Sequence, residues 1–417
     1  MHQLRIRGGR PLRGWLQVEG AKNSALKLLV ACLLSEDELL LENVPENQDV
    51  HTMTGMLRAL GQRVDHPAPG RYRLSGGGEL LERAPYELVR LMRDSFTVLG
   101  PLLARLGRAE VPLPGGCNLG PRPVNFHLSG LRALGAQIKL VGGVVQARAR
   151  HLHGAEIRLA YPSVGATAHL LLTAALIPER TLIQGAAQEP EISDLIRLLG
   201  RMGAEVRRVG QAVEVRGAAR LGGARHRVIP DRVQAGSYAL AAAISGGELN
   251  IHCRPDHLSA LTCGLRQLGI TVSEGPEALH VRGGPLRRGL SLETRPYPGF
   301  ATDFQPQMTA LLSLAPGESR LRETVFPSRF GHVPELLRLG ADISVRGDTL
   351  LIRGVKRLQG ARVRVSSICA GEALVLAALA ARGETIIEDE GHLQRRYSRL
   401  AWQLAELGAD VSYSDEA

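Results

Sequence analysis

Apolar residues along the chain alternate between helical and strand-like periods in a repeating order. Six segments space their leucines for one face of a helix, end in Leu-Gly or a close variant, and run on into a short strand pattern. This pattern predicts amphipathic helices that end where a glycine adopts the left-handed conformation. The glycines, which by subtraction lie between 66 and 74 residues apart, are Gly61, Gly135, Gly203, Gly269, Gly340 and Gly408. The regular period predicts six copies of one structural unit.

A second helix, rich in Ala and Leu, is predicted before each of these and is followed by a strand. Each unit is thus helix, strand, helix, strand, with one further strand before the next unit. The apolar helices are predicted over 24–34, 95–106, 167–176, 237–244, 304–314 and 371–381.

Three units make one domain, and the midpoint of the chain falls near 227–230. Residues 1–20 lie outside the first unit, so we expect them to cross over and complete the second domain. The prediction is a first domain over 21–229 and a second over 1–20 plus 230–417, with a cleft between them. A chain of 417 residues agrees with two domains.

Composition narrows the class of protein. Hydrophobic residues make up 44% of the chain and charged residues 22%, as in ordinary globular proteins. No signal-peptide pattern and no apolar run of roughly 20 residues is present, so we expect no membrane span. The five cysteines form no CxxC pair and no metal-ligand spacing, which indicates a reduced, cytoplasmic protein without a bound metal.

The net charge of +10 comes from cations scattered along the chain. Without a basic tail or aromatic-rich surface motif, this favours an anionic small molecule over nucleic acid as the partner. Nearly all cations are Arg, so the rare lysines, Lys22 among them, indicate places that need a compact point charge. No Gly-Lys dipeptide, GxGxxG, HExxH or GxSxG motif occurs, which argues against P-loop, dinucleotide and common hydrolase sites.

One loop, 112–123, has the sequence PLPGGCNLGPRP. Its glycines permit unusual backbone angles while its prolines limit slack, so Cys117 is expected to be presented to a substrate rather than packed. This interpretation makes the loop a reactive lid.

The other unusual residues fall in two equivalent loops of each unit. The first kind precedes the apolar helices, whose N-termini offer unpaired N–H groups to anions. These loops contain Lys22, Asn23, Arg93, Asp94, 163–167, 231–237, Thr302, Asp303 and 366–372. The second kind contains Asp49, Cys117, Arg122, Glu189, Glu191, Asp256, Arg329 and Arg395.

Several of these residues also have an ordinary structural interpretation. Lys22 is either a phosphate ligand or a solvated lysine, and Arg93 either a phosphate contact or a structural ion pair. Asp303 is either a helix N-cap or a general base fixed by the rigid PYPGFATD loop. His127 is interpreted as structural, and packing is the expected role of Cys32, Cys253 and Cys263.

Linked motifs along the chain resemble those of the UDP-N-acetylglucosamine enolpyruvyl transferases. They are GAKNSALKLLVACLL, LPGGCNLGPRPVNFHLSGL, YPSVGAT, EPEISD, PDRVQAGSY, YPGFATDFQPQ and ETVFPSRFGHVPEL, in order along essentially the whole chain. The shikimate-pathway enolpyruvyl transferases share the fold but lack the cysteine lid, so they are the weaker match.

The resemblance implies an α/β fold of two inside-out α/β barrel domains, each of three βαβαββ repeats. It implies transfer of the enolpyruvyl group from phosphoenolpyruvate to the 3-hydroxyl of UDP-N-acetylglucosamine, the first committed step of peptidoglycan synthesis, with no cofactor. Such chemistry needs a base, an acid and cations around a trianionic reactant.

Residue by residue, the resemblance implies that Cys117 protonates the phosphoenolpyruvate methylene and is the thiol that fosfomycin alkylates. Asp303 would take the proton from the sugar hydroxyl. Lys22, Arg122 and Arg395 would hold phosphoenolpyruvate, and cations near Cys117 would lower its pKa. The sugar-nucleotide residues would be Asn23, Arg93, Arg122, Pro123, Val124, Asn125, Phe126, Ser163, Val164, Asp303 and Val325.

The chain departs from the family pattern mainly in its last unit. Ser367 and Cys369 replace an Asp and an Arg, Gln394 and Arg396 replace an Asp and a Gly around Arg395, and Asn125 replaces an Asp. One hypothesis is that Arg396 supplies the missing cation. Two alternatives to the main function stay open: a catalytically impaired paralogue that binds a UDP-sugar as a regulatory or interaction protein, and a transferase with a different acceptor.

Overall fold

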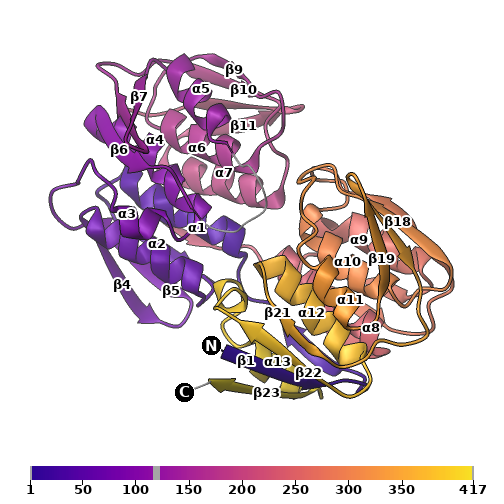
Figure 1. Cartoon of the computed structure of the whole chain (residues 1–417). Coiled ribbons are helices and arrows are strands. Elements are labelled where there is room, and N and C mark those ends of the chain that lie inside the picture. The colour runs from indigo at the N-terminus through magenta and orange to yellow at the C-terminus, as the bar shows by residue number, and fades with distance from the viewer. Residues whose placement is uncertain (1, 116–122, 416–417) are drawn as a thin grey trace. The chain divides into compact units, whose positions relative to one another are not determined.

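A computed structural model describes residues 2–115 and 123–415 of the chain (Figure 1). These residues form two compact units. The first unit contains the described residues from Gly20 to Ile229, and the second contains those up to Glu19 together with those from Pro230 onward.

The first unit contains helices and strands in a repeating order. Its helical segments are α1 (Lys22–Val30), η1 (Ala31–Leu34), α2 (Gln48–Ala59), α3 (Tyr86–Val89), η2 (Arg93–Val98), α4 (Leu99–Leu106), α5 (Asn125–Ala133), α6 (Val164–Ala174) and α7 (Pro190–Met202). Its strands are β3 (Leu39–Glu42), β4 (Gln62–Ala68), β5 (Arg71–Gly76), β6 (Arg108–Pro112), β7 (Gln137–Val141), β8 (Val144–Arg148), β9 (Glu156–Arg158), β10 (Arg180–Gln184), β11 (Glu205–Val209), β12 (Ala212–Arg216) and β13 (Ala224–Arg227).

The second unit repeats this order and adds the N-terminal strands. Its helical segments are α8 (Arg232–Ser245), η3 (Pro255–Leu258), α9 (Ser259–Gln267), η4 (Thr302–Phe304), α10 (Gln305–Leu312), α11 (Val333–Arg338), α12 (Ile368–Ala380), η5 (Leu393–Arg395) and α13 (Leu400–Glu406). Its strands are β1 (His2–Arg7), β2 (Arg13–Gln17), β14 (Glu248–His252), β15 (Thr271–Glu274), β16 (Ala278–Arg282), β17 (Ser291–Glu293), β18 (Glu318–Arg322), β19 (Asp342–Arg346), β20 (Thr349–Arg353), β21 (Arg362–Arg364), β22 (Glu384–Asp389) and β23 (Asp410–Asp415).

Each repeat builds one small mixed sheet. In the repeat from β9 to β12 the chain order is βαβαββ and the sheet order is β11-β12-β10-β9, with β10 parallel to β9 and antiparallel to β12. The same arrangement recurs as β17-β18-β20-β19. The sheet β6-β8-β7 has three strands. In place of the parallel edge strand of the other sheets, it has an isolated parallel bridge between Arg83 and Glu110. The repeats predicted from the glycine spacing are therefore present.

Two sheets of the second unit take a strand from the start of the chain. β1 lies between β22 and β23 and pairs antiparallel with both, Leu4 facing Ile387 on one side and Tyr413 on the other. β2 pairs parallel with β14, Leu16 facing Ile251. In the first unit the closing strand comes instead from the end, because β13 pairs parallel with β3.

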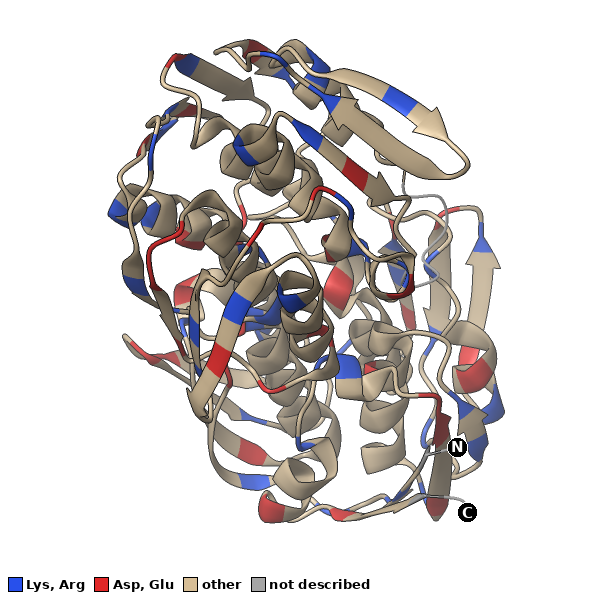
Figure 2. Cartoon of the chain, turned by 90° about the vertical axis from the view of Figure 1, so that its left-hand side faces the viewer, with Lys and Arg blue, Asp and Glu red and all other residues tan. Residues whose placement is uncertain are grey.

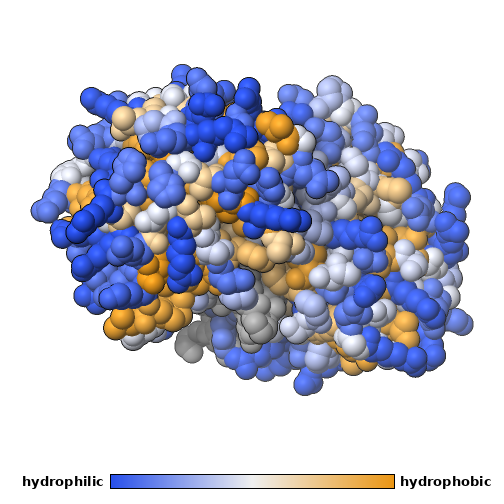
Figure 3. All heavy atoms as spheres, turned by 90° about the horizontal axis from the view of Figure 1, so that it is seen from above, coloured by the Kyte–Doolittle hydropathy of each residue, from blue (hydrophilic) through white to orange (hydrophobic). Residues whose placement is uncertain are grey.

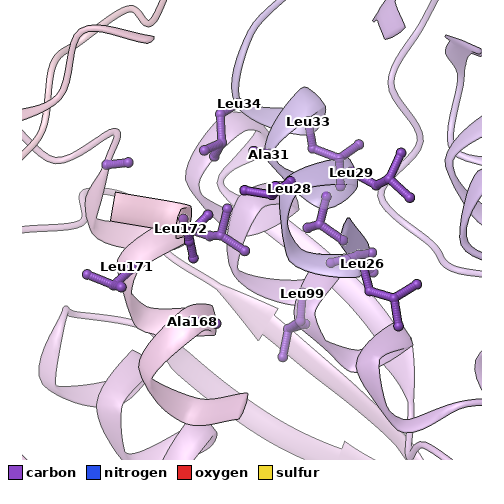
Figure 4. Packing of buried hydrophobic residues seen from close by; sticks show 14 of the residues in the cluster. Leu26, Leu28, Leu29, Ala31, Leu33, Leu34, Leu99, Ala168, Leu171 and Leu172 are labelled. Atoms are coloured by element: carbon purple, nitrogen blue, oxygen red, sulfur yellow. The ribbon is translucent and has the colours of Figure 1, made fainter. Parts of the chain in front are cut away.

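The apolar helix of each repeat lies inside its unit. In α8 every residue except Ser245 is buried, and in α12 every residue except Ala380. A helix that is apolar all round must be covered on all sides, so the sheets and the amphipathic helices lie around it. In the first unit Leu26, Leu28 and Leu29 of α1 belong to the same buried hydrophobic cluster as Leu99 of α4 and Leu172 of α6 (Figure 4). This arrangement is the inside-out α/β barrel that the resemblance implies.

Charged residues of both signs are interspersed along strands and helices (Figure 2). On the face seen in Figure 3, hydrophilic residues cover most of the surface and hydrophobic ones lie in small groups between them. Among the residues that the structure describes, no helix has the length and apolar character needed to cross a membrane.

All six repeat glycines have the positive φ that the Leu-Gly pattern predicts, from 87° at Gly340 to 110° at Gly203. Such angles crowd the Cβ of any other residue. In α7 this conformation ends the helix at Gly203, whereas Gly200 lies within the helix and a Cβ there would meet open space.

These two glycines give opposite predictions for one substitution. Gly203→Ala is expected to lower the free energy of unfolding by about 1–2 kcal/mol, because alanine is strained at this φ. Gly200→Ala, the matched control, is expected to raise it by about 0.5–1 kcal/mol, because it removes backbone freedom from the unfolded chain. Urea unfolding of both variants checks this, and two changes of the same sign would contradict it.

Candidate active site

The carboxylate of Asp303 lies just before α10 in the second unit, in the short η4 turn where the PYPGFATD loop ends. Nη2 of Arg329 donates to its Oδ1 at 3.0 Å, and Nη1 donates to the hydroxyl of Thr302 at 2.8 Å. Thr302 in turn donates to Glu323, whose other oxygen accepts from Thr294. The side chain of Arg329 is 5% exposed and that of Asp303 26% exposed. Neither η4 nor α10 has a side-chain N-cap, so the N-cap interpretation of Asp303 is wrong.

Three arginines lower the pKa of Asp303. Burial alone would raise the pKa of this carboxyl, but the guanidinium groups of Arg329, Arg396 and Arg232 outweigh it and hold the pKa below its ordinary value. We call these three residues the arginine cluster. Asp303 is therefore ionised at neutral pH while it faces cations.

Position 369, where the resemblance predicts an arginine, is uncharged in this chain. Cys369 is buried in the first turn of α12, its Sγ accepts from Nη2 of Arg329 at 2.7 Å and lies 3.7 Å from Oδ1 of Asp303. Burial raises the pKa of this thiol, although Arg329 beside it acts in the opposite direction. Ser367 caps α12 by accepting from the N–H of Ala370 at 3.3 Å. The two replacements thus leave a neutral, well-capped helix start.

Arg396 is buried, 4% exposed, and its charge is balanced by two carboxylates. Its Nε lies 3.1 Å from Oε1 of Glu372, and its Nη1 lies 3.7 Å from Oδ2 of Asp231. Glu372 also accepts from the hydroxyl of Tyr397 at 3.0 Å and from the amide of Gln307 at 2.8 Å. Burial alone would lower the pKa of Arg396, but Glu372 and Asp231 raise it. Arg396 is therefore a fixed, buried cation whose charge helps to lower the pKa of Asp303.

In the first unit, Lys22 at the start of α1 pairs with Asp49 at the start of α2, with Nζ 2.9 Å from Oδ2. Its side chain is 7% exposed, so the interpretation of Lys22 as a solvated lysine is wrong. Lys27, one turn further on, donates to the carbonyl of Asn23 at 2.7 Å and to Asp94 at 3.1 Å. The pair Lys22–Asp49 joins α1 to α2, and the pair Lys27–Asp94 joins α1 to η2. In each pair the ammonium group of a lysine is held by a carboxylate.

Arg93 is half-buried and donates from Nη2 to the carbonyl of Pro123 at 3.0 Å. Pro123 and Asn125 are exposed, and Val124 and Phe126 are half-buried beside them. Cys117 and Arg122, to which the sequence gives central roles, lie outside the described residues.

The remaining predicted residues lie at helix starts and loop ends. Ser163 caps α6 by accepting from the N–H of Ala166 at 3.3 Å, and Val164 is the first residue of that helix. Arg395 ends the η5 turn and is half-buried. Val325 is half-buried, and its N–H donates to Glu323 at 2.9 Å. The N-terminus of α6 therefore presents N–H groups of the kind that bind anions.

The sequence analysis missed the role of Glu372 and gave Arg329 no partner. Glu372 is an acidic residue in an otherwise apolar helix pattern, a signal that a buried cation lies nearby. The packing role of Cys263 is also wrong, because this residue is exposed on α9, whereas Cys32 and Cys253 are buried. Among residues 2–115 and 123–415, no group of three or more His, Cys, Asp or Glu side chains could hold a metal ion.

Comparison with known proteins finds a family match along nearly the whole chain. The family model described as EPSP synthase (3-phosphoshikimate 1-carboxyvinyltransferase) matches residues 6–404. A relative from Acidiphilium cryptum (strain JF-5), named UDP-N-acetylglucosamine 1-carboxyvinyltransferase, is 48% identical over 415 residues, which cover 99% of each chain. A relative of the same name from Gloeobacter violaceus is 45% identical and covers 98% of this chain and 90% of its own.

Two solved structures share the fold. The crystal structure of the enolpyruvyl transferase NikO from Streptomyces tendae aligns with a TM-score of 0.90 at 24% identity, covering 100% of this chain and 99% of its own. An EPSP synthase from Acinetobacter baumannii aligns over 100% of both chains with a TM-score of 0.76 at 19% identity. At these identities the likeness concerns the fold alone.

The depressed pKa of Asp303 predicts how its contribution to stability depends on pH. Because the pKa is lower in the folded protein than the roughly 3.9 of an unfolded chain, the contribution is present above about pH 4 and is lost as the pH falls through the folded pKa. Asp303→Asn is expected to cost about 1.5–3 kcal/mol at pH 7 and progressively less in acid.

Urea unfolding of the unmodified chain and of Asp303→Asn at a series of pH values checks this. Asp65→Asn, which removes an exposed partner of Arg63, serves as the control and should cost under about 1 kcal/mol at pH 7. A penalty for Asp303→Asn that stays constant down to acid pH would contradict the ionised state of this carboxyl.

Proposed function

Because the chain belongs to the enolpyruvyl transferase family that the EPSP synthase model describes, we propose that it is a UDP-N-acetylglucosamine 1-carboxyvinyltransferase. It transfers the enolpyruvyl group of phosphoenolpyruvate to the 3-hydroxyl of UDP-N-acetylglucosamine and releases phosphate. The proposal rests on curated relatives of 45–48% identity along almost the whole chain that carry this name. The shikimate-type structure, at 19% identity, is the more distant match.

Asp303 is proposed as the base. It takes the proton of the 3-hydroxyl while that oxygen bonds to C2 of phosphoenolpyruvate, and the thiol of Cys117 gives a proton to C3. The resulting tetrahedral adduct then loses a proton from C3 and its phosphate from C2, which restores the double bond. Atoms balance, since one sugar hydroxyl proton and one phosphate ester are exchanged for an enol ether and inorganic phosphate.

The cations proposed to hold phosphoenolpyruvate are Lys22, Arg122 and Arg395. To these we add Arg329, which pairs with Asp303, and Arg396, whose charge also lowers the pKa of Asp303, because position 369 supplies no charge. Glu372 holds Arg396 in a fixed position, and from there the charge of Arg396 acts on Asp303. The arginine cluster therefore supports activity in spite of Cys369.

The sugar nucleotide is proposed to bind the first unit. Residues 123–126 would hold the uracil, Asn23 and Arg93 would position the nucleotide sugar, and Ser163 with Val164 would place the diphosphate at the N-terminus of α6. Val325 in the second unit would contact the sugar. The two proposed domains are 21–229 and 1–20 plus 230–417, and the proposed compartment is the cytoplasm.

Phosphate release from phosphoenolpyruvate, with and without UDP-N-acetylglucosamine, tests this function. The unmodified chain is expected to release phosphate only when the sugar nucleotide is present. Cys117→Ala is expected to lose this activity together with alkylation by fosfomycin, which mass spectrometry detects. Cys263→Ser, which removes an exposed thiol, is the control and should keep both.

Two outcomes would contradict the proposal. Binding of UDP-N-acetylglucosamine without any phosphate release, together with activity in Ser367→Asp/Cys369→Arg, would identify an impaired paralogue. Release that depends on another acceptor in place of UDP-N-acetylglucosamine would identify a transferase of different specificity.

A further inference from the structure

Two buried histidines of the first unit form a hydrogen-bonded pair that the proposed mechanism does not use. His127 lies in the first turn of α5 and His169 in the middle of α6, and their Nδ1 atoms are 2.9 Å apart. His127 is 6% exposed and His169 is fully buried. The ring of Phe96 meets both imidazoles edge-on, with centroids 5.6 and 5.9 Å away. We call these two residues the histidine pair.

The hydrogen bonds of the pair allow one arrangement of protons. The N–H of Gly100 donates to Nε2 of His169 at 2.7 Å, and a backbone amide cannot accept. Nε2 of His169 is therefore an acceptor, so the neutral ring carries its proton on Nδ1 and donates it to Nδ1 of His127. His127 in turn carries its proton on Nε2. Burial is the larger cause, and the neighbouring His127 the smaller, of a pKa of His169 well below its usual value. The ring of His169 is therefore neutral.

The ring of His127 lies along the first two turns of α6. A Cβ at Gly165 would be 3.3 Å from Nε2 and Cε1 of His127, and His169 lies four residues further on, on the same face of the helix. One imidazole thus contacts α6 at both points. Its own helix, α5, begins at Asn125, and α6 begins at Val164. The histidine pair therefore fixes the distance between these two helix starts.

These helix starts carry the residues proposed for the two parts of the nucleotide. We propose that the histidine pair is a positioning element that sets the spacing between the uracil residues 123–126 and the diphosphate site at the start of α6, and so favours a nucleoside diphosphate. This inference rests on the proposed function and deepens it. The affinity of a ligand that contacts both helix starts depends on the distance between them, whereas the affinity of a ligand that contacts only one does not.

The directional bond makes the proposal testable by choice of side chain. In His127→Asn the amide oxygen takes the place of Nδ1 and accepts the proton of His169. In His127→Gln the side-chain amide lies one bond further from the backbone, so it does not replace Nδ1. In His127→Leu and His169→Leu one residue of the pair becomes apolar, and the remaining histidine is buried without this hydrogen bond. Loss of such a bond weakens an interaction that depends on it by roughly tenfold.

The experiment measures binding of UDP and of uridine without phosphoenolpyruvate, and steady-state kinetics with both substrates. The Gln and Leu variants are expected to bind UDP roughly tenfold more weakly and to raise KM for UDP-N-acetylglucosamine in parallel. Their affinity for uridine, their KM for phosphoenolpyruvate and their kcat at saturation should stay within about twofold, as for lost uniform binding. His127→Asn should resemble the unmodified chain.

Leu172→Val, a substitution of a fully buried residue in α6 (Figure 4), controls for general loss of stability. It should lower the Tm and leave UDP binding unchanged. The proposal is overturned if the Leu variants bind UDP normally, if uridine affinity falls as much as UDP affinity, or if His127→Asn behaves like His127→Leu. Absence of phosphate release by the unmodified chain would overturn the proposed function instead, because UDP binding is measured without turnover.

Discussion

The candidate site of the second unit depends on one electrostatic constraint, an ionised carboxylate held among buried guanidinium groups. A buried charge is costly unless it is paired and hydrogen-bonded. Asp303 balances Arg329, and Glu372 with Asp231 balances Arg396. The neutral Cys369 adds no charge to this set. The charges of this network can therefore be balanced with a neutral residue at position 369.

The same pairing explains how the site can bind anions and then act as a base. While Asp303 faces three cations its pKa is low, which makes it a weak base. An anionic reactant that takes over those cations would remove the cause of the low pKa and raise the basicity of Asp303 as the substrate arrives. Lys22, held by Asp49 in the first unit, is a compact cation kept in a similar ion pair. Both units thus present cations that are already positioned.

Much of this architecture was predictable from the sequence, and the reasons are local. The Leu-Gly endings predict left-handed helix ends, and the repeat of apolar helices predicts the buried helices such as α8 and α12. The partners of charged groups were not predictable, because they join residues far apart in the chain. Lys22 could be a phosphate ligand or a solvated lysine until Asp49 was placed beside it, and Arg396 had no known partner until Glu372 was placed against it. The exposure of Cys263 was not predictable either, because the residue type alone does not indicate whether a helical cysteine lies on the buried or the exposed face.

The most direct test of this account is the kinetics of Arg396→Gln and of the double variant Glu372→Gln/Arg396→Gln, which removes Arg396 together with the carboxylate closest to it. If Arg396 supplies charge that position 369 lacks, both folded variants should lose roughly 10- to 150-fold in kcat/KM for phosphoenolpyruvate. Arg399→Gln, which removes an arginine stacked on Trp402, should change it by less than about twofold. Unchanged kcat/KM in the folded double variant would contradict the central role of the arginine cluster.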